Sequence, residues 1–368
     1  MSEKRSFDLV VVGGGVIGLS CAWRAAQRGA SVAVLERKRP PAGATRVAAG
    51  MLAPVGELTF GEPELLGMTL AAAELYPEFV AELEAASGIA TGYDRIGALH
   101  VALDRDEAAE LRRVHDLQRS LGLEAEWLSP RSCRDLEPGL TPSFNGGVLA
   151  SGEAAIDPRA LTAALLAALE GEGVELRAGV EVDAALIDEG RVTGVRMSDE
   201  EGLAAGSVLL ATGALAGEGA WVPERGRPPV RPVKGQILEL RPRPAAPPPC
   251  ERILASERVY LVPRPDGRLI VGATVEEQGH DTAVTAGGVH ELLREAYRLL
   301  PDVAEMELIE AAAGLRPGTP DNLPRIGPSP IEGLLWATGH FRNGILMAPL
   351  AAEAIAGLLA AEAVGSAR

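Results

Sequence analysis

The chain is poor in lysine and cysteine, and both shortages limit what it can be. Only three of its 35 basic residues are lysines, so nearly every cation in the chain is an arginine. No CxxC pair and no Cys/His spacing typical of a metal site occurs, so no metal is expected. The cysteines are few, odd in number and widely spaced, which suits a reducing compartment and predicts a cytoplasmic protein. They are Cys21, Cys133 and Cys250.

Long apolar runs and excess positive charge are also absent. The first six residues are polar and the apolar run after them ends in glycines, so we expect no signal peptide. The most membrane-like stretch, residues 345–364, is interrupted by Glu353 and Glu362 and predicts a buried, alanine-rich helix. The net charge of −16 repels phosphate backbones and anionic lipid, so neither nucleic acid nor a membrane is an expected partner.

A glycine-rich turn lies near the start of the chain. Residues 13–18 (GGGVIG) follow an apolar stretch that predicts a buried strand and precede a predicted helix. Gly13 permits the tight turn, Gly15 lets the backbone approach a pyrophosphate, and Gly18 lets the helix pack close to the sheet. The pattern in this context predicts a dinucleotide site, whereas a glycine turn by itself would be weak support.

An acidic residue supports the same interpretation. Glu36 ends the next predicted strand, 18 residues after Gly18, where a carboxylate binds ribose hydroxyls. A carboxylate there disfavours the 2′-phosphate of NADP. The turn and its acid leave FAD and NAD as alternatives.

The order of predicted elements indicates two interleaved domains. Segments typical of a parallel α/β nucleotide-binding domain occur at the start, the middle and the end of the chain, and segments typical of an antiparallel α+β unit lie between them. We therefore predict an α/β fold, a Rossmann-like domain with an interleaved α+β substrate domain built on an antiparallel sheet. The expected boundaries are 1–85, 146–222 and 310–368 for the nucleotide domain, and 86–145 and 223–309 for the substrate domain.

Several later segments, with the glycine turn, resemble the D-amino acid oxidase superfamily of FAD oxidoreductases, and within it the glycine oxidases of thiamine biosynthesis. The resemblance covers nearly the whole chain, and it implies FAD as the cofactor. It is carried by residues 48–52 (AAGML), 232–235 (PVKG), 260–264 (YLVPR), 267–274 (GRLIVGAT), 313–319 (AGLRPGT) and 339–346 (GHFRNGIL).

The resemblance assigns three residues to the substrate. It implies that Arg316 and Tyr260 hold a substrate carboxylate and that Arg342 lines the same pocket. A planar guanidinium can grip a carboxylate in two places, and a tyrosine hydroxyl adds a third bond. A structural ion pair is the alternative for either arginine in so arginine-rich a chain.

The resemblance also assigns the cofactor site, along most of the chain. His340 is expected to be a loop residue without a proton-transfer task. The implied cofactor-binding residues are Gly13, Gly15, Val16, Ile17, Gly18, Glu36, Arg37, Ala44, Thr45, Ala49, Gly50, Met51, Val180, Gly213, His340, Phe341, Arg342, Asn343, Gly344, Ile345 and Leu346.

Two features differ from sarcosine oxidases of the superfamily, which tether FAD through a late cysteine and use a lysine near the flavin. No cysteine follows Cys250, so non-covalent FAD is predicted, and Lys234 is taken as structural.

The implied activity is oxidative deamination of glycine or another small amino acid or amine, with oxygen as electron acceptor. The products would be a 2-oxo acid, ammonia and hydrogen peroxide, with a role in thiazole synthesis for thiamine. Sarcosine oxidase, D-amino acid dehydrogenase and an NAD-binding sensor without chemistry stay as alternatives. A homo-oligomer is left open.

Overall fold

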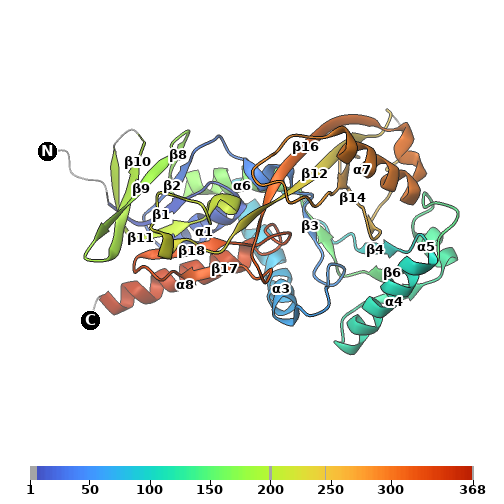
Figure 1. The fold of residues 1–368 in the computed structure, drawn as a ribbon, viewed down its shortest axis with the longest axis horizontal. Coiled ribbons are helices and arrows are strands. Elements are labelled where there is room, and N and C mark those ends of the chain that lie inside the picture. Colours follow the sequence, from blue (N-terminus) through green and yellow to red (C-terminus); the bar gives the residue numbers. More distant parts are fainter. Residues whose placement is uncertain (1–5, 199–200, 245, 367–368) are drawn as a thin grey trace.

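The computed structural model describes residues 6–198, 201–244 and 246–366. Two eight-stranded sheets dominate it, and they lie toward opposite ends of the long axis (Figure 1). A third, two-stranded sheet pairs β3 (Met51–Leu52) with β7 (Ala154–Ala155). The chain passes between the two large sheets several times, as the interleaved pattern of the sequence predicts.

The first sheet has a parallel core. Neighbouring strands β8, β2, β1, β11 and β18 all run in parallel, and β17, β10 and β9 add antiparallel strands. The central strands are apolar on both faces, since both are covered. Their bounds are β1 (Ser6–Val12), β2 (Val32–Glu36), β8 (Glu175–Ala178), β9 (Val182–Asp188), β10 (Arg191–Met197), β11 (Gly202–Leu210), β17 (Arg325–Pro328) and β18 (Leu334–Thr338).

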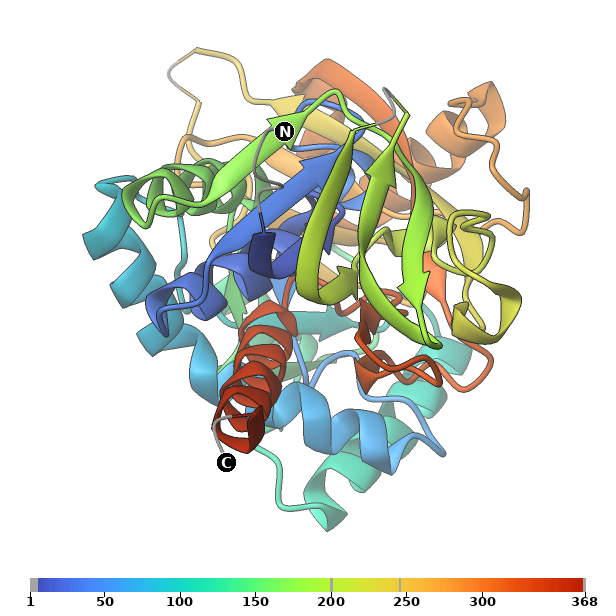
Figure 2. The same cartoon turned by 90° about the vertical axis from the view of Figure 1, so that its left-hand side faces the viewer.

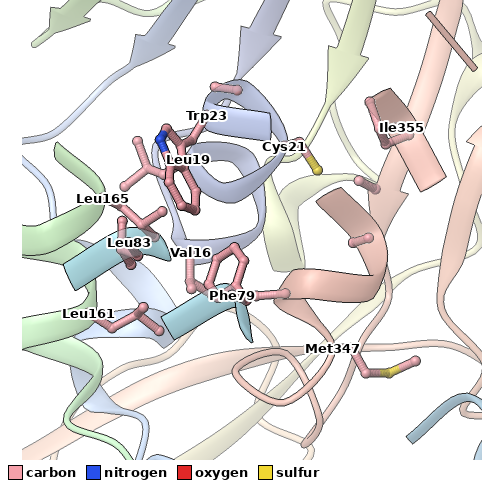
Figure 3. Packing of buried hydrophobic residues seen from close by; sticks show 14 of the residues in the cluster. Val16, Leu19, Cys21, Trp23, Phe79, Leu83, Leu161, Leu165, Met347 and Ile355 are labelled. Carbon is pink, nitrogen blue, oxygen red and sulfur yellow. The ribbon is translucent and has the colours of Figure 1, made fainter. Parts of the chain in front are cut away.

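Four helices cover one face of this sheet. Trp23 of α1 packs edge-on against Phe79 of α3, with ring centroids 5.4 Å apart, and Leu161 and Ile355 belong to the same apolar cluster (Figure 3). The opposite face packs against the extension formed by β9 and β10, which is prominent in Figure 2. The covering helices are α1 (Val16–Gln27), α3 (Pro63–Ser87), α6 (Pro158–Gly171) and α8 (Ala348–Ser366).

The second sheet is antiparallel except for one parallel pair, β13 with β4. The turn at residues 264–268 joins β14 and β15 as a hairpin, as its Pro-Asp-Gly sequence predicts. In sheet order the strands are β16 (Glu307–Gly318), β12 (Arg231–Arg241), β15 (Leu269–Gly272), β14 (Tyr260–Pro263), β13 (Ile253–Ala255), β4 (Ala98–Val101), β6 (Gly147–Ala150) and β5 (Glu126–Leu128).

The other helices accompany the second sheet and the connections. They are α2 (Gly43–Val47), α4 (Arg105–Ser120), α5 (Pro130–Leu136), α7 (Ala286–Leu299), and the 3-10 turns η1 (Gly213–Leu215), η2 (Glu224–Gly226) and η3 (Pro301–Glu305). Asp104 caps α4 and Thr285 caps α7 through side-chain oxygens that accept backbone N–H bonds.

Two strands lie in a different sheet from the one that the sequence-based division gave them. Strands β6 and β16 pair within the second sheet, although residues 146–222 and 310–368 were assigned to the nucleotide domain. The reason for β16 is its partner β12, which it follows in register from Arg231 to Arg241 with one irregularity. A glycine- and proline-bearing sequence at residues 313–319 conceals this long strand.

Helix α3 contains a proline in its interior, Pro77, and runs continuously through it. In the described part of the chain, no helix is long and apolar enough to cross a membrane.

Candidate active site

The predicted nucleotide-binding residues gather at one edge of the first sheet. The glycine turn follows β1, Glu36 ends β2, Val180 follows β8, Gly213 follows β11, and the 340–346 loop follows β18. These five strands are parallel neighbours, so their carboxyl ends share one edge. In open α/β sheets, ligands bind at that edge.

The glycine turn leaves a helix N-terminus free for an anion. A Cβ atom on Gly18 would lie 2.0 Å from the Gly13 carbonyl oxygen, so only glycine allows this packing. The N-cap residue of α1, Gly15, has no side chain, and the first turn of the helix holds no acidic residue, although the Val16 N–H is bound by Thr45. An acid-free helix N-terminus beside bare backbone fits a pyrophosphate. Val16 and Ile17 open this helix.

Glu36 lies directly beside the turn. Its carboxylate accepts hydrogen bonds from the backbone N–H of Gly14 at 2.7 Å and of Lys38 at 2.9 Å. The Glu36 carbonyl accepts a bond from the N–H of Val180, which brings the middle-strand residue to the same place. The Arg37 side chain is exposed to solvent. The acid is thus held where a ribose of a dinucleotide on this turn would lie.

The segment from Ala44 to Met51 borders the turn on its other side. Thr45 Oγ1 accepts a hydrogen bond from the Val16 N–H at 3.1 Å, which joins α2 to the start of α1. The buried Arg264 donates to the Ala49 carbonyl at 2.6 Å and to the Ile156 carbonyl at 2.8 Å. An arginine from the turn between β14 and β15 therefore fixes the backbone at Ala49.

The loop at residues 340–346 connects the two sheets. The Phe341 N–H donates to the carbonyl of Pro317, the residue after Arg316, at 2.9 Å. Tyr76 donates its hydroxyl hydrogen to the Ile345 carbonyl at 3.1 Å. Burial lowers the pKa of His340 to about 3, so its ring is neutral, and its Nε2 has no hydrogen-bond partner among the described residues. Asn343, Gly344 and Leu346 complete the loop.

Arg316 and Tyr260 face each other across the second sheet. Arg316 lies on β16 and donates from Nη1 to the carbonyls of Thr274 at 3.0 Å and Lys234 at 3.4 Å. Tyr260 lies on β14, where burial raises its hydroxyl pKa and the nearby Arg316 guanidinium opposes that rise. The tyrosine ring lies over Gly272, where an added Cβ would come within 2.4 Å of the hydroxyl oxygen. A cation and a neutral phenol converge here.

Arg342 lies close enough to influence Tyr260 electrostatically, but its side chain is more exposed than that of Arg316. Its side chain is exposed and its guanidinium lies 5.6 Å from the centre of the Phe341 ring. Its charge acts on both Tyr260 and Glu57. The fold therefore brings together all three residues that are expected to contact the substrate. Two of them lie on the second sheet and one lies on the loop after β18.

Glu57 is a candidate residue that the sequence analysis did not single out. Burial raises the pKa of its carboxyl group, while the charges of Arg342 and Arg316 oppose the rise. It lines a small pocket together with Leu58, Thr69 and Asn343. No motif marks this glutamate, because its place depends on how residues 53–62 fold back over the second sheet.

Buried polar side chains anchor the base of that segment. Glu153 accepts a hydrogen bond from the Gly56 N–H, and Gln118 donates to the Val55 carbonyl at 2.9 Å. Burial raises the pKa of Glu153 to about 8 and lowers that of His100 to about 4, so both are uncharged near neutral pH. The two anchoring groups, Gln118 of α4 and Glu153 just before β7, lie 63 and 97 residues after the backbone groups that they bind.

The family model for FAD dependent oxidoreductases (DAO) matches residues 8–358. Among curated proteins, the bifunctional protein ThiO/ThiG of Trichormus variabilis is 38% identical over 351 residues, which cover 95% of this chain and 52% of that protein. This chain thus spans about half the length of such two-part relatives.

Single-function relatives match over nearly their whole length. Glycine oxidase of Geobacillus kaustophilus is 33% identical over 365 residues, which cover 96% of this chain and 93% of that protein. A crystal structure of glycine oxidase from Geobacillus kaustophilus superposes with a TM-score of 0.90 at 32% identity, and the match covers 97% of this chain and 95% of that one. The two chains therefore share one fold over 97% of this chain.

Proposed function

This chain belongs to the FAD dependent oxidoreductase family, and from that premise we propose that it catalyses the oxidative deamination of glycine and other small amino acids or amines. The observation that carries the proposal is the meeting of Arg316 and Tyr260 beside the loop at residues 340–346. The Phe341 N–H bond to the Pro317 carbonyl joins the predicted carboxylate-binding group to the predicted cofactor loop. The relatives named glycine oxidase support the choice of substrate.

Arg316 and Tyr260 would bind the substrate carboxylate. The guanidinium supplies two parallel N–H donors and the phenol supplies one more, and both are oriented before substrate arrives. The raised pKa of Tyr260 keeps its hydroxyl protonated, and so a donor, at physiological pH. Arg342 would add positive charge at the open side of the pocket.

FAD fits the edge of the first sheet, where the acid-free helix N-terminus of α1 would receive its pyrophosphate and Glu36 its ribose. When bound, FAD accepts the two electrons released as the substrate amine becomes an imine. The residues of this chain contribute position: the carboxylate is fixed at Arg316, so the Cα–H is presented in one orientation. The neutral His340 adds no charge to the loop.

Water would hydrolyse the imine formed from glycine to glyoxylate and ammonia, and oxygen would take up the two electrons and two protons to give hydrogen peroxide. A role in thiazole synthesis for thiamine is supported by the relatives named ThiO/ThiG, in which a sequence like this one forms part of a longer protein. The three cysteines are free and buried, which supports the reducing cytoplasm as its location.

A peroxide-coupled screen of the purified, yellow protein tests this function. Glycine, sarcosine and D-alanine are supplied in turn, and peroxide and ammonia are measured. Glycine should bleach the flavin without oxygen and yield peroxide in air. The Arg316→Met variant should keep its FAD and need at least about a hundredfold more glycine for half-maximal rate.

The other results identify the alternatives. A strong preference for sarcosine would indicate a sarcosine oxidase. Flavin reduction by D-alanine without peroxide, together with activity on an artificial quinone, would indicate a D-amino acid dehydrogenase. A colourless protein that binds NAD would contradict the proposal altogether.

A further inference from the structure

Lys234 is the one lysine of the described second domain, and its side chain is 1% exposed. A buried ammonium group loses its hydration and needs hydrogen-bonded partners. Its Nζ lies 2.9 Å from Asp281 Oδ2 and 3.6 Å from Glu276 Oε2. Both carboxylates belong to the segment that follows β15, so the lysine ties that segment to β12.

The backbone repeats the same connection. The Lys234 N–H donates to the Glu276 carbonyl at 2.9 Å, and the Glu276 N–H donates to the Lys234 carbonyl at 3.0 Å. Glu276 also accepts hydrogen bonds from the Gln236 amide at 2.7 Å and from the Thr274 hydroxyl. Lys234, Thr274 and Glu276 therefore form one connected unit.

Arg316 is bound to this unit. The two carbonyls that accept its Nη1 are those of Thr274 and Lys234. The guanidinium lies over Gly235, the residue between Lys234 and Gln236 on β12. Any movement of the Lys234–Glu276 bridge therefore moves the carbonyls of Thr274 and Lys234. The remaining N–H groups of Arg316 would then point in a different direction.

We propose that Lys234 is a positioning residue for substrate binding: through Glu276 and Asp281 it fixes the two carbonyls that aim the Arg316 guanidinium. The inference rests on the proposed function, because it takes Arg316 as the carboxylate-binding group. Misplacing a bidentate donor by about 1 Å can cost on the order of a hundredfold. The lysine acts on affinity for the carboxylate and leaves the oxidation of bound substrate nearly unchanged.

The test uses the FAD-loaded full chain and glycolate, a carboxylate without an amine, whose binding is followed by the change in flavin absorbance. Lys234→Met removes the ammonium and keeps a linear apolar side chain in its place. It should weaken glycolate binding at least about tenfold and raise the KM for glycine in parallel, with kcat within about twofold. Asp281→Asn should give a smaller effect in the same direction, because Glu276 still faces the lysine.

Two further variants distinguish a failure of this inference from a failure of the proposed function. Arg252→Met breaks another partly buried ion pair of the same domain, with Glu137, and should lower the unfolding temperature without changing glycolate affinity. Arg316→Met must weaken glycolate binding if the proposed function is correct; unchanged binding there would refute that function and this inference together. The role of Lys234 alone is refuted by a different result. In that result Arg316→Met weakens glycolate binding, but Lys234→Met and Asp281→Asn weaken it no more than Arg252→Met does.

Discussion

Gly235 lies directly beneath the guanidinium of Arg316. A Cβ atom added to Gly235 would lie 2.3 Å from Nη1 and 2.4 Å from Nη2. These distances are far below any van der Waals contact, and β12 and β16 are paired here in register, so the backbone has little room to yield. The arginine side chain must therefore move if this glycine gains a side chain.

Gly235→Ala is accordingly expected to displace Arg316 and to raise the KM for glycine by about tenfold or more, with a smaller loss of stability. Steady-state kinetics and glycolate binding measure the effect. Gly287→Ala is the matched control, since nothing lies within 4 Å of the added atom there, and it should leave KM unchanged. Equal KM values for the wild type and Gly235→Ala would show that Arg316 does not need its present position.

Arg264→Met is expected to loosen FAD. The guanidinium fixes the Ala49 carbonyl and the Ile156 carbonyl, and its removal leaves two buried acceptors without partners, at a cost of about 1–3 kcal/mol each. We expect at least about a tenfold rise in the dissociation constant of FAD, measured by titrating apoprotein with FAD and following flavin fluorescence. Arg258→Met changes an exposed arginine of the same domain and should bind FAD like the wild type. Unchanged FAD affinity in Arg264→Met would contradict a role for this arginine in holding the backbone at Ala49 and Ile156 in place for the cofactor.

Glu153 should make the stability of the protein fall as pH rises. Its folded pKa of about 8 lies above the ordinary value of 4.5, so its contribution is fully present below pH 4.5 and is lost as pH rises through about 8. Within that window the free energy of unfolding decreases by up to about 1.4 kcal/mol per pH unit from this group. Urea unfolding at several pH values measures it.

Glu153→Gln is the matched variant for that measurement, because an amide keeps the acceptor oxygen for Gly56 and cannot ionise. The difference in unfolding free energy between the variant and the wild type should grow in favour of the variant from pH 4.5 to 8. His100, whose folded pKa of about 4 lies below the ordinary 6.5, acts in the opposite direction, since its contribution is present above pH 6.5 and is lost as pH falls through 4. A constant difference at all pH values would show that Glu153 titrates normally.

FAD is expected to leave the protein on acid precipitation. The three cysteines, Cys21, Cys133 and Cys250, are free and buried, and none occurs later in the sequence. The supernatant should contain all of the yellow colour, and mass spectrometry of the pellet should give the mass of the unmodified chain. Flavin retained in the precipitate would indicate a covalent link.

Sequence alone is enough to predict the dinucleotide turn, because every requirement there is local. Gly13, Gly15 and Gly18 are needed by a tight turn, a close backbone approach and a packed helix, all within six residues. The hairpin of β14 and β15 can likewise be predicted from the sequence, because Pro265, Asp266 and Gly267 specify a turn by themselves. The sequence does not predict strand β16, because its pairing with β12 depends on residues about 80 positions earlier.

Sequence alone predicts a nucleotide-binding turn and, by resemblance, names Tyr260, Arg316 and Arg342 as partners of a substrate. Tertiary structure alone decided what surrounds them. It placed Glu57 near both arginines, laid Arg316 over Gly235, and joined Lys234 to Glu276 behind it. The reason is physical: burial, charge and close contact arise between segments far apart in the chain, and no local pattern encodes those distances.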